Sequence, residues 1–426
     1  MGTNRVVVTG LGVCAPNAVS VPDFKEAIAD GKSGVRFFSE LRDLKFSCQI
    51  GAMPLIPQRK IDDYFTPLQL RNFNSAGILY GVIAGMDAWK DAGLKTEHEI
   101  PDFDSGTVFG MGTLGVDKYR ESIYKVDDGN VRRLGSTSVQ QTMSSGVSAY
   151  LGGMLGLGNL VTSNSSACAT GTEAILTAYE RIKYGKAKRM LAGSTSDGGP
   201  YVWCGFDALR ILPSKYNKDP KAASRPMDSN ASGFVPGCGA GALVLESLDS
   251  ALARNATIYA EILGGHSNSG GQRQGGSMTA PNSEAVVNCI KGAVADAKIA
   301  PQQIDAINGH LTATTMDAQE IKNWSSALGL KGMDFPYINS LKGMVGHCLA
   351  ASGSIECVAS VLQLKNDFLF PNINITEVHP EILEEVDISK IPLNKINIPL
   401  QTLIKASFGF GDVNCCLIFS IYKPNL

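Results

Sequence analysis

Residues 164–173 of the chain are Asn-Ser-Ser-Ala-Cys-Ala-Thr-Gly-Thr-Glu, and the expected fold and chemistry follow from this stretch. The apolar residues 160–162 before it are few and partly β-branched, which predicts a buried strand. After it, apolar residues recur at helical spacing until Gly185, so a helix is expected to begin near Cys168. The stretch therefore predicts a strand, a turn carrying a cysteine, and a helix.

The position of Cys168 makes it a candidate nucleophile. A cysteine in the first turn of a helix lies beside unpaired backbone N–H groups and the positive end of the helix dipole. Both favour the thiolate, which is the reactive form of cysteine. The neighbours Ser166, Ala167, Ala169 and Gly171 are small, so a substrate can approach the sulfur closely. A lone buried cysteine is more often inert, so the functional interpretation depends on partners elsewhere in the chain.

The composition bounds the class of protein. A chain of 426 residues predicts two domains or one duplicated domain. Its 44% hydrophobic and 18% charged residues indicate a globular protein, and its net charge of −2 argues against a globally basic nucleic-acid-binding protein. No apolar stretch reaches the ~18 residues of a membrane span. Ten cysteines without paired spacing, and no secretory signal, predict reduced thiols and a cytoplasmic location.

Strands alternate with helices along both halves of the chain, which predicts an α/β fold. The two halves also share a sequence pattern. Asn-Ser at 164–165 precedes Cys168 and a helix, and Asn-Ser at 339–340 precedes Lys342, His347 and a second helix. This repeated pattern predicts a duplication. If the halves pack about a pseudo-twofold axis, Cys168 is expected to face His347.

Two local patterns concern other functions and elements. Residues 110–115, Gly-Met-Gly-Thr-Leu-Gly, match the spacing of a dinucleotide-binding loop. They lie beyond the first βα unit and lack the acidic residue that should close a second strand, so a tight turn is the preferred interpretation. Thr66 and Pro67 resemble the start of a long helix that ends at Gly93.

Only two of the five histidines are candidates for catalysis. His310 directly follows a predicted strand, and His347 leads into a predicted helix. His98 lies in a charged loop and His379 precedes a proline, so both are expected at the surface, whereas His266 is interpreted as a loop residue. Two histidines at corresponding places, together with Cys168, favour a functional site over structural roles.

Four segments in the order of the chain resemble motifs of the β-ketoacyl-acyl carrier protein synthases of types I and II. Residues 166–171 are similar to the nucleophile motif, and residues 308–314, Asn-Gly-His-Leu-Thr-Ala-Thr, to the first histidine motif. Residues 340–347 resemble the lysine and second histidine motif, and residues 407–411, Ser-Phe-Gly-Phe-Gly, the gating loop. The resemblance spans nearly the whole chain.

This resemblance implies a duplicated thiolase-like fold with two pseudo-symmetric halves in a layered αβαβα arrangement. Residues 1–250 would carry the nucleophile, and residues 251–426 the histidines, the lysine and the gating loop. The implied activity is an acyltransferase reaction: a decarboxylative Claisen condensation that elongates a fatty-acid, polyketide or polyene chain by two carbons. No cofactor or metal is implied, because acyl carrier protein brings the substrates on its phosphopantetheine arm.

The resemblance also implies residue roles. Cys168 would take the acyl group, His310 and His347 would hold the malonyl thioester oxygen, and Lys342 would orient and polarise the site around His310. The N–H groups of Cys168 and Phe410 would form the oxyanion hole. Substrate-binding roles fall to the pantetheine-binding threonines and to aromatic side chains that line or gate the acyl pocket: Thr312, Thr314, Phe206, Phe408 and Phe410. The implied partners are acyl carrier protein and a second subunit, in a homodimer or a heterodimer, without nucleic acid or membrane.

Several positions depart from the family pattern. Leu311 and Ala313 replace a glycine and a serine, and the spacing from His310 to Glu320 is one residue shorter, so the placing of Glu320 near Lys342 is open. Asp412 puts a charge on the gating loop, and residues 231–233 and 238 lack the usual acidic side chains. These changes surround preserved motifs, which favours an active condensing enzyme with an unusual substrate, in a specialised polyketide or polyene pathway.

The carrier proteins of this family are acidic, so a basic patch is expected around the pocket mouth. Asp412 is expected beside it, paired with a lysine or arginine that biases the gating loop. The candidates for the patch are Arg59, Lys60, Arg71, Lys215 and Arg225.

The sequence disfavours four other classes of protein. A thiolase would lack the His347 motif, and a type III synthase would have an asparagine as its third catalytic residue. A chain-length-factor-like subunit, which does not elongate chains itself, would lack the nucleophilic cysteine, whereas Cys168 is present. A serine or papain-like hydrolase is disfavoured because its sequence signatures are absent.

Overall fold

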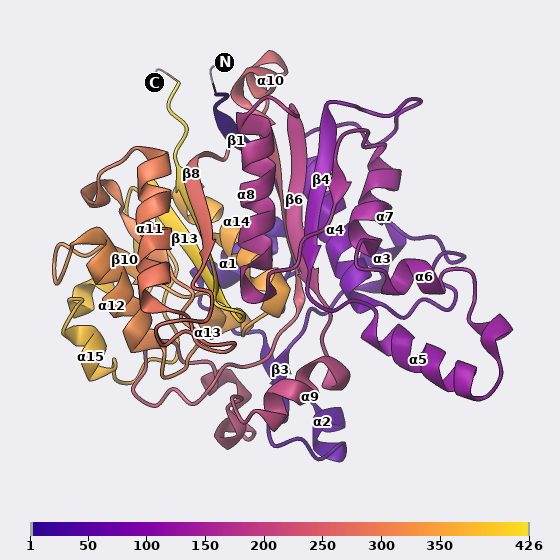
Figure 1. Ribbon diagram of the computed structural model, residues 1–426, viewed down its shortest axis with the longest axis horizontal. Coiled ribbons are helices and arrows are strands. Elements are labelled where there is room, and N and C mark those ends of the chain that lie inside the picture. Colours follow the sequence, from indigo (N-terminus) through magenta and orange to yellow (C-terminus); the bar gives the residue numbers. More distant parts are fainter. Residues whose placement is uncertain (1–2, 425–426) are drawn as a thin grey trace.

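The computed structural model describes residues 3–424 and contains one large, mixed β-sheet (Figure 1). Its ten strands lie in the order β10-β9-β13-β14-β8-β1-β7-β6-β4-β5. Five come from the first half of the chain: β1 (Val6–Cys14), β4 (Ser105–Met111), β5 (Val161–Thr162), β6 (Arg189–Ser196) and β7 (Gly239–Ser247). Five come from the second half: β8 (Ala260–Ser269), β9 (Ala306–Asn308), β10 (Tyr337–Asn339), β13 (Thr402–Gly409) and β14 (Val413–Ser420).

The two halves repeat one topology. Reading from each outer edge inwards, the strand order β5-β4-β6-β7-β1 matches β10-β9-β13-β14-β8. Both halves have two parallel pairings followed by two antiparallel pairings. They join where β1 and β8 pair antiparallel over residues 6–8 and 260–262. The predicted duplication of an α/β fold is therefore confirmed.

Helices complete five layers. On the outside of the first half, α4 (Ala76–Asp91) packs on β1 and β7, with α7 (Gly146–Leu155) beside it. On the outside of the second half, α11 (Ser283–Ala297) packs on β8 and β14, with α12 (Asp317–Leu328) beside it. Between the two groups of strands lie α8 (Thr170–Lys183) and α14 (Ser352–Lys365) (Figure 1). The expected αβαβα layering is thus present.

The remaining elements are short or peripheral. They are α1 (Val21–Ala29), β2 (Val35–Phe37), α2 (Ser39–Asp43), β3 (Ile50–Ala52), α3 (Gln58–Asp62), α5 (Val116–Asp127), α6 (Ser138–Thr142), α9 (Pro200–Ala208), α10 (Leu248–Ala253), α13 (Lys342–Val345), β11 (Phe368–Leu369), α15 (Pro380–Leu383) and β12 (Ile396–Asn397). Of these, α5 and α6 form an arm that projects beyond the layers (Figure 1). Two short 3₁₀ turns, η2 (Ala167–Ala169) and η6 (Leu349–Ala351), directly precede α8 and α14 respectively.

The central helices cross at two glycines. A Cβ atom built on Gly171 of α8 would lie 2.4 Å from the backbone nitrogen of Ser354, and one built on Gly353 of α14 would lie 2.6 Å from that of Thr172. No side chain fits at these distances, because the obstacle is the backbone of the facing helix. Every residue of α14 except Lys365 is buried, as expected for a helix covered on all sides.

Of three local expectations, two need correction. The long helix does not begin at Thr66 but at Ala76, after a series of turns in which Asn72 has a φ of 60°. The strand at 160–162 is not buried: β5 forms the edge of the sheet, and Val161 is 38% exposed. The tight turn at 110–115 is present, and Gly115 ends it with a φ of 66° as the N-cap of α5.

All ten cysteines are free thiols. Between residues 3 and 424, no helix combines the length and apolarity that crossing a membrane would require.

The glycine crossing gives a stability prediction. Gly171→Ala should destabilise the protein by about 3 kcal/mol, because α8 and α14 must move apart to admit the methyl group. Gly153→Ala is a matched control: this exposed glycine of α7 has no atom within 4 Å of a built Cβ. It should stabilise by about 0.5–1 kcal/mol through helix propensity. Thermal unfolding measures both, and equal melting temperatures for the two variants would contradict the close crossing.

Candidate active site

The nucleophile turn holds Cys168 in a defined position. Cys168 lies in η2, so it precedes α8 instead of belonging to its first turn, which refines the expected placement. Ala167 has a φ of 48°, a left-handed conformation that turns the chain sharply. The turn is tied to the helix because Thr170 Oγ1 accepts the Ser166 N–H and donates to the Ala167 carbonyl.

Two backbone N–H groups reach the sulfur of Cys168: its own and that of Phe410, which follows β13. The approach of β13 requires Gly409, since a Cβ there would lie 3.0 Å from the Cys168 nitrogen. Two convergent N–H donors beside a nucleophile are the arrangement of an oxyanion hole.

The thiol of Cys168 does not ionise readily in the free protein, contrary to expectation. Burial raises its pKa above the ordinary value, against the opposing effects of the Phe410 N–H and the positive charge of Lys342. The residue is only partly buried by surface area, but its exposed part faces the cavity and not the outer surface, so desolvation still prevails.

His347 presents a fixed tautomer. Its Nδ1 accepts the backbone N–H of Leu349 at 3.0 Å and lies 3.1 Å from Ser352 Oγ. A backbone N–H can only donate, so Nδ1 carries no proton and the neutral ring holds its proton on Nε2. Burial, followed by the charge of Lys342, lowers the pKa of His347 well below its ordinary value. The side chain is therefore a neutral hydrogen-bond donor.

His310 is held from behind by Glu320. The Glu320 carboxylate accepts the N–H groups of His310 and Leu311, each at 2.7 Å, and lies 3.2 Å from Trp324 Nε1. The His310 ring is buried, and its Nδ1 has no hydrogen-bond partner among residues 3–424. Burial, then the charges of Lys342 and His347, lowers the pKa of His310, so this imidazole is also neutral.

Lys342 pairs with Glu356 and not with Glu320, which settles the question left by the shortened spacing. Its Nζ lies 2.5 Å from Glu356 Oε1, and both side chains are 1% exposed. Glu320 instead has a pKa raised to about 7, through burial and then the charge of Asp317.

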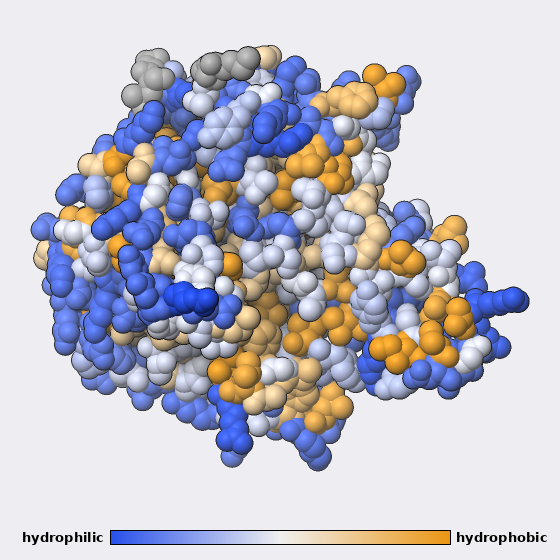
Figure 2. Space-filling model, in the orientation of Figure 1, coloured by the Kyte–Doolittle hydropathy of each residue, from blue (hydrophilic) through white to orange (hydrophobic). Residues whose placement is uncertain are grey.

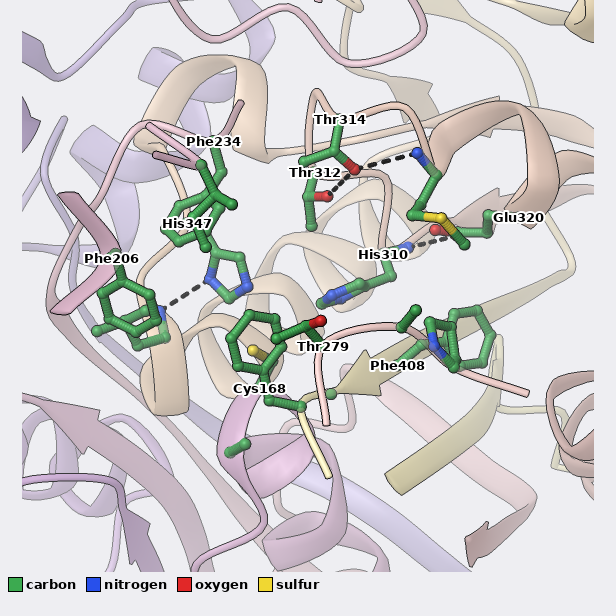
Figure 3. Close-up of a pocket in the computed structure, with 18 of the residues that line it drawn as sticks. Cys168, Phe206, Phe234, Thr279, His310, Thr312, Thr314, Glu320, His347 and Phe408 are labelled. Atoms are coloured by element: carbon green, nitrogen blue, oxygen red, sulfur yellow. Dashed lines mark hydrogen bonds between the residues drawn. The ribbon is translucent and has the colours of Figure 1, made fainter. Parts of the chain in front are cut away.

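Of the predicted catalytic residues, Cys168, His310 and His347 line one cavity of about 650 Å³. Lys342 is buried outside this lining, against Glu356. The Sγ atom of Cys168 and one ring nitrogen each of His310 and His347 lie within 4.8 Å of one another, so the cysteine faces both histidines (Figure 3). Thr312 and Thr314, whose hydroxyls are 3.0 Å apart, also line it. So do the three predicted aromatic residues, Phe206, Phe408 and Phe410.

Two residues of the lining were not predicted from the sequence. Phe234 stands between two predicted residues, with its ring centroid 5.1 Å from that of His347 and 5.4 Å from that of Phe206. Thr279, from the loop after β8, reaches the cavity near Cys168 (Figure 3). Neither had a local signal, because both lie in irregular segments whose path depends on the rest of the fold. Glu356 and Lys405 were also missed, although a charged residue in an otherwise apolar segment is a detectable signal.

The departures at Leu311 and Ala313 are packing changes. Leu311 is fully buried in the core of the second half. Ala313 is buried with a φ of 63°, and its N–H donates to Asp317 at 3.1 Å. Cys238, which stands where the family has an acidic residue, is buried in the hydrophobic core of the first half.

The expected environment of Asp412 is wrong. Asp412 is fully buried and not in a surface ion pair. Its Oδ1 accepts the Asn282 N–H at 2.8 Å, its Oδ2 accepts the Gln272 N–H at 2.9 Å, and its carbonyl accepts the Gly270 N–H at 2.9 Å. Asp412 therefore connects the gating loop to the loop of residues 270–282.

Only three of the five residues expected to form the basic patch are exposed. Arg225 is buried and paired with Asp228, and Lys60 is paired with Asp87. Arg59, Arg71 and Lys215 are exposed.

Comparison with known proteins identifies the class. Residues 3–251 match the N-terminal domain of the beta-ketoacyl synthase family, and residues 259–376 match its C-terminal domain. The chain therefore belongs to the β-ketoacyl synthase family.

Relatives are similar over almost their full length. The chain is 34% identical to 3-oxoacyl-[acyl-carrier-protein] synthase 1 of Haemophilus influenzae, covering 98% of this chain and 99% of the relative. It is 33% identical to the chloroplastic synthase I of Arabidopsis thaliana, covering 99% and 87%. Among solved structures, a beta-ketoacyl synthase from Burkholderia phymatum superposes with a TM-score of 0.89 at 30% identity, covering 99% of this chain and 100% of that one. A type II polyketide ketosynthase in complex with its acyl-carrier protein superposes at 0.87 with 29% identity and the same coverage.

The contacts of Asp412 give a second prediction. Asp412→Asn keeps one acceptor oxygen and tolerates the φ of 61°, but it leaves the N–H of Gln272 or Asn282 without a partner. The cost should be about 1–2 kcal/mol, with faster amide hydrogen exchange confined to residues 270–282. Asp387→Asn, at a half-buried residue whose carboxylate accepts hydrogen bonds from Ser389, should leave exchange in that loop unchanged. Unaltered exchange in Asp412→Asn would contradict the connection.

Proposed function

We propose that this protein catalyses the decarboxylative condensation of an acyl thioester with malonyl-acyl carrier protein. The observation that carries the proposal is the convergence of Cys168, with two N–H donors at its sulfur, on the neutral imidazoles of His310 and His347 in one cavity. The relatives named as 3-oxoacyl-[acyl-carrier-protein] synthases support it.

In the acylation half-reaction, the sulfur of Cys168 attacks the thioester carbonyl of the acyl group. The N–H groups of Cys168 and Phe410 hold the oxyanion as the carbonyl becomes tetrahedral. The C–S bond to the carrier breaks, and the proton of the Cys168 thiol leaves with the carrier thiol. No separate base is assigned: the leaving thiolate is the final proton acceptor.

In the condensation half-reaction, the thioester oxygen of the malonyl group lies between His310 and His347. Their N–H groups donate to this oxygen as the bond to the carboxylate breaks, CO₂ leaves, and the electron pair forms an enolate. The enolate carbon then attacks the carbonyl of the acyl-cysteine. The new C–C bond replaces the C–S bond, and the Cys168 thiolate is released and reprotonated. This chemistry requires no metal or cofactor.

The acyl group is proposed to be an apolar chain of fatty-acid, polyketide or polyene synthesis. The cavity is bordered by apolar side chains on the side of α9: Val202, Phe206, Leu209, Ile211 and Phe234. Such a lining suits an apolar acyl chain. A subunit that cannot elongate chains is disfavoured, because Cys168 is present and faces both histidines.

Cys168→Ala and His347→Ala should separate the half-reactions. Cys168→Ala should show no acyl adduct by intact-protein mass spectrometry. His347→Ala should still be acylated but lose 10²–10³-fold in CO₂ release from malonyl-carrier protein, on the order expected for one donor to a developing oxyanion. Cys204→Ala, at an exposed cysteine, serves as the control. Acylation persisting in Cys168→Ala would exclude this cysteine as the nucleophile.

Acyl carrier protein and a second copy of the chain are the proposed partners. The projecting arm exposes six apolar side chains: Tyr119, Ile123, Tyr124, Val126, Val131 and Val139. Figure 2 shows orange, hydrophobic patches on the arm. The edge strand β5 is open as well, and an open edge favours pairing with another strand. Both features favour a homodimer over a monomer, in the cytoplasmic location predicted from the sequence.

The dimer is testable by sedimentation velocity. The protein should sediment at twice the monomer mass of 45.2 kDa, and Ile123→Glu on α5 should weaken the dimer at least tenfold by burying a charge. Ile388→Glu, at an equally exposed residue of the second half, should not. A purified chain that is monomeric at micromolar concentration would favour a heterodimer with a different subunit.

A further inference from the structure

Beneath the active site lies a buried cluster of three charged side chains. Glu356 of α14 stands between two lysines: its Oε1 is 2.5 Å from Lys342 Nζ, and its Oε2 is 2.9 Å from Nζ of Lys405 on β13. All three side chains are at most 1% exposed. Two ammonium groups and one carboxylate leave one net positive charge.

Ion pairing with Glu356 does not by itself explain why Lys405 is buried here. Lys342 already supplies one cation for one carboxylate. Within residues 3–424, Glu356 Oε2 accepts no well-aligned hydrogen bond, so its contact with Lys405 is an ion pair of poor geometry. Lys405 Nζ also donates to the Ala406 carbonyl and, at 3.1 Å, to Ser407 Oγ. Burying an extra cation without its own anion costs free energy, so stability does not account for Lys405.

The missing negative charge arises during the proposed reaction. When CO₂ leaves, the enolate oxygen between His310 and His347 becomes negative, and a fixed buried cation nearby favours that state. The same cation keeps both imidazoles neutral: Lys405 lowers the pKa of each, after burial and Lys342. A protonated imidazole would still donate, but it would add a costly buried charge to the free enzyme.

We propose that Lys405 is a positioning residue which, through Glu356 and Lys342, makes the floor of the active site net positive for the decarboxylation step. The inference rests on the proposed function. The ionisable groups around Lys405 are Lys342, Glu356, the two histidines, and the buried thiols of Cys357, Cys415 and Cys416. Cys168 lies near Lys342 and Glu356, and Glu320 accepts the backbone N–H of His310 from the other side.

The test compares Lys405→Met with Lys405→Arg and Lys365→Met. Lys405→Met keeps the volume and leaves Glu356 balanced by Lys342, so the fold should persist. Lys405→Arg keeps the charge. Lys365→Met removes the same charge from an exposed site at the end of α14.

The first measurement is CO₂ release from malonyl-carrier protein against pH. Loss of a cation raises the pKa of a neighbouring histidine, so in Lys405→Met the acid side of the profile should move up by about one pH unit, with kcat reduced at least tenfold. The profiles of Lys405→Arg and Lys365→Met should stay in place. A uniform loss of rate without a pH shift would reduce Lys405 to a structural residue and overturn the proposal.

The second measurement does not need turnover. NMR of histidine-labelled protein should show His310 and His347 titrating at higher pH in Lys405→Met than in the parent chain. Only five imidazoles need assignment. If the parent protein released no CO₂ but the histidines shifted, the proposed function would fail and the electrostatic role of Lys405 would stand. Unshifted histidines would overturn that role itself.

Discussion

The structure depends on the contact between α8 and α14 at Gly171 and Gly353, where two helix backbones touch. Each helix begins at a turn that faces the cavity, so the distance between the helices sets the distance between the sulfur of the first half and the imidazoles of the second. Neither half contains a complete site. The sheet joins the halves over only three residue pairs, and the buried helices therefore determine how the two sets of residues meet.

The charges of the site follow from the same burial. Desolvation lowers the pKa of both histidines and raises that of Cys168, so the free enzyme keeps all three neutral. Cations stay below them, on Lys342 and Lys405. The site is thus positively charged before substrate binds, and negative charge develops there only during the reaction. Such an arrangement stabilises the transition state more than the ground state.

Much of this site could be predicted from the sequence, because Cys168, His310 and His347 each sit at a short turn with its own local signal. The predictions failed where tertiary context decides. Residues 160–162 have the composition of a buried strand but form an edge, and Asp412, which looks like a surface charge on a loop, is enclosed by residues 270–282. Lys405 was visible as a lysine within an apolar strand; its partner on α14 could not be known before the helix was placed.

The turns before the two central helices have the same backbone conformation but place different side chains at the site. In η2 the left-handed residue is Ala167, with a φ of 48°, and in η6 it is Leu349, with a φ of 51°. The next residue is Cys168 in one and Ala350 in the other, and both line the same cavity. The two turns therefore present equivalent positions of the repeat to one space. One position supplies the sulfur of Cys168, whereas the other carries only the methyl group of Ala350 and forms part of the wall.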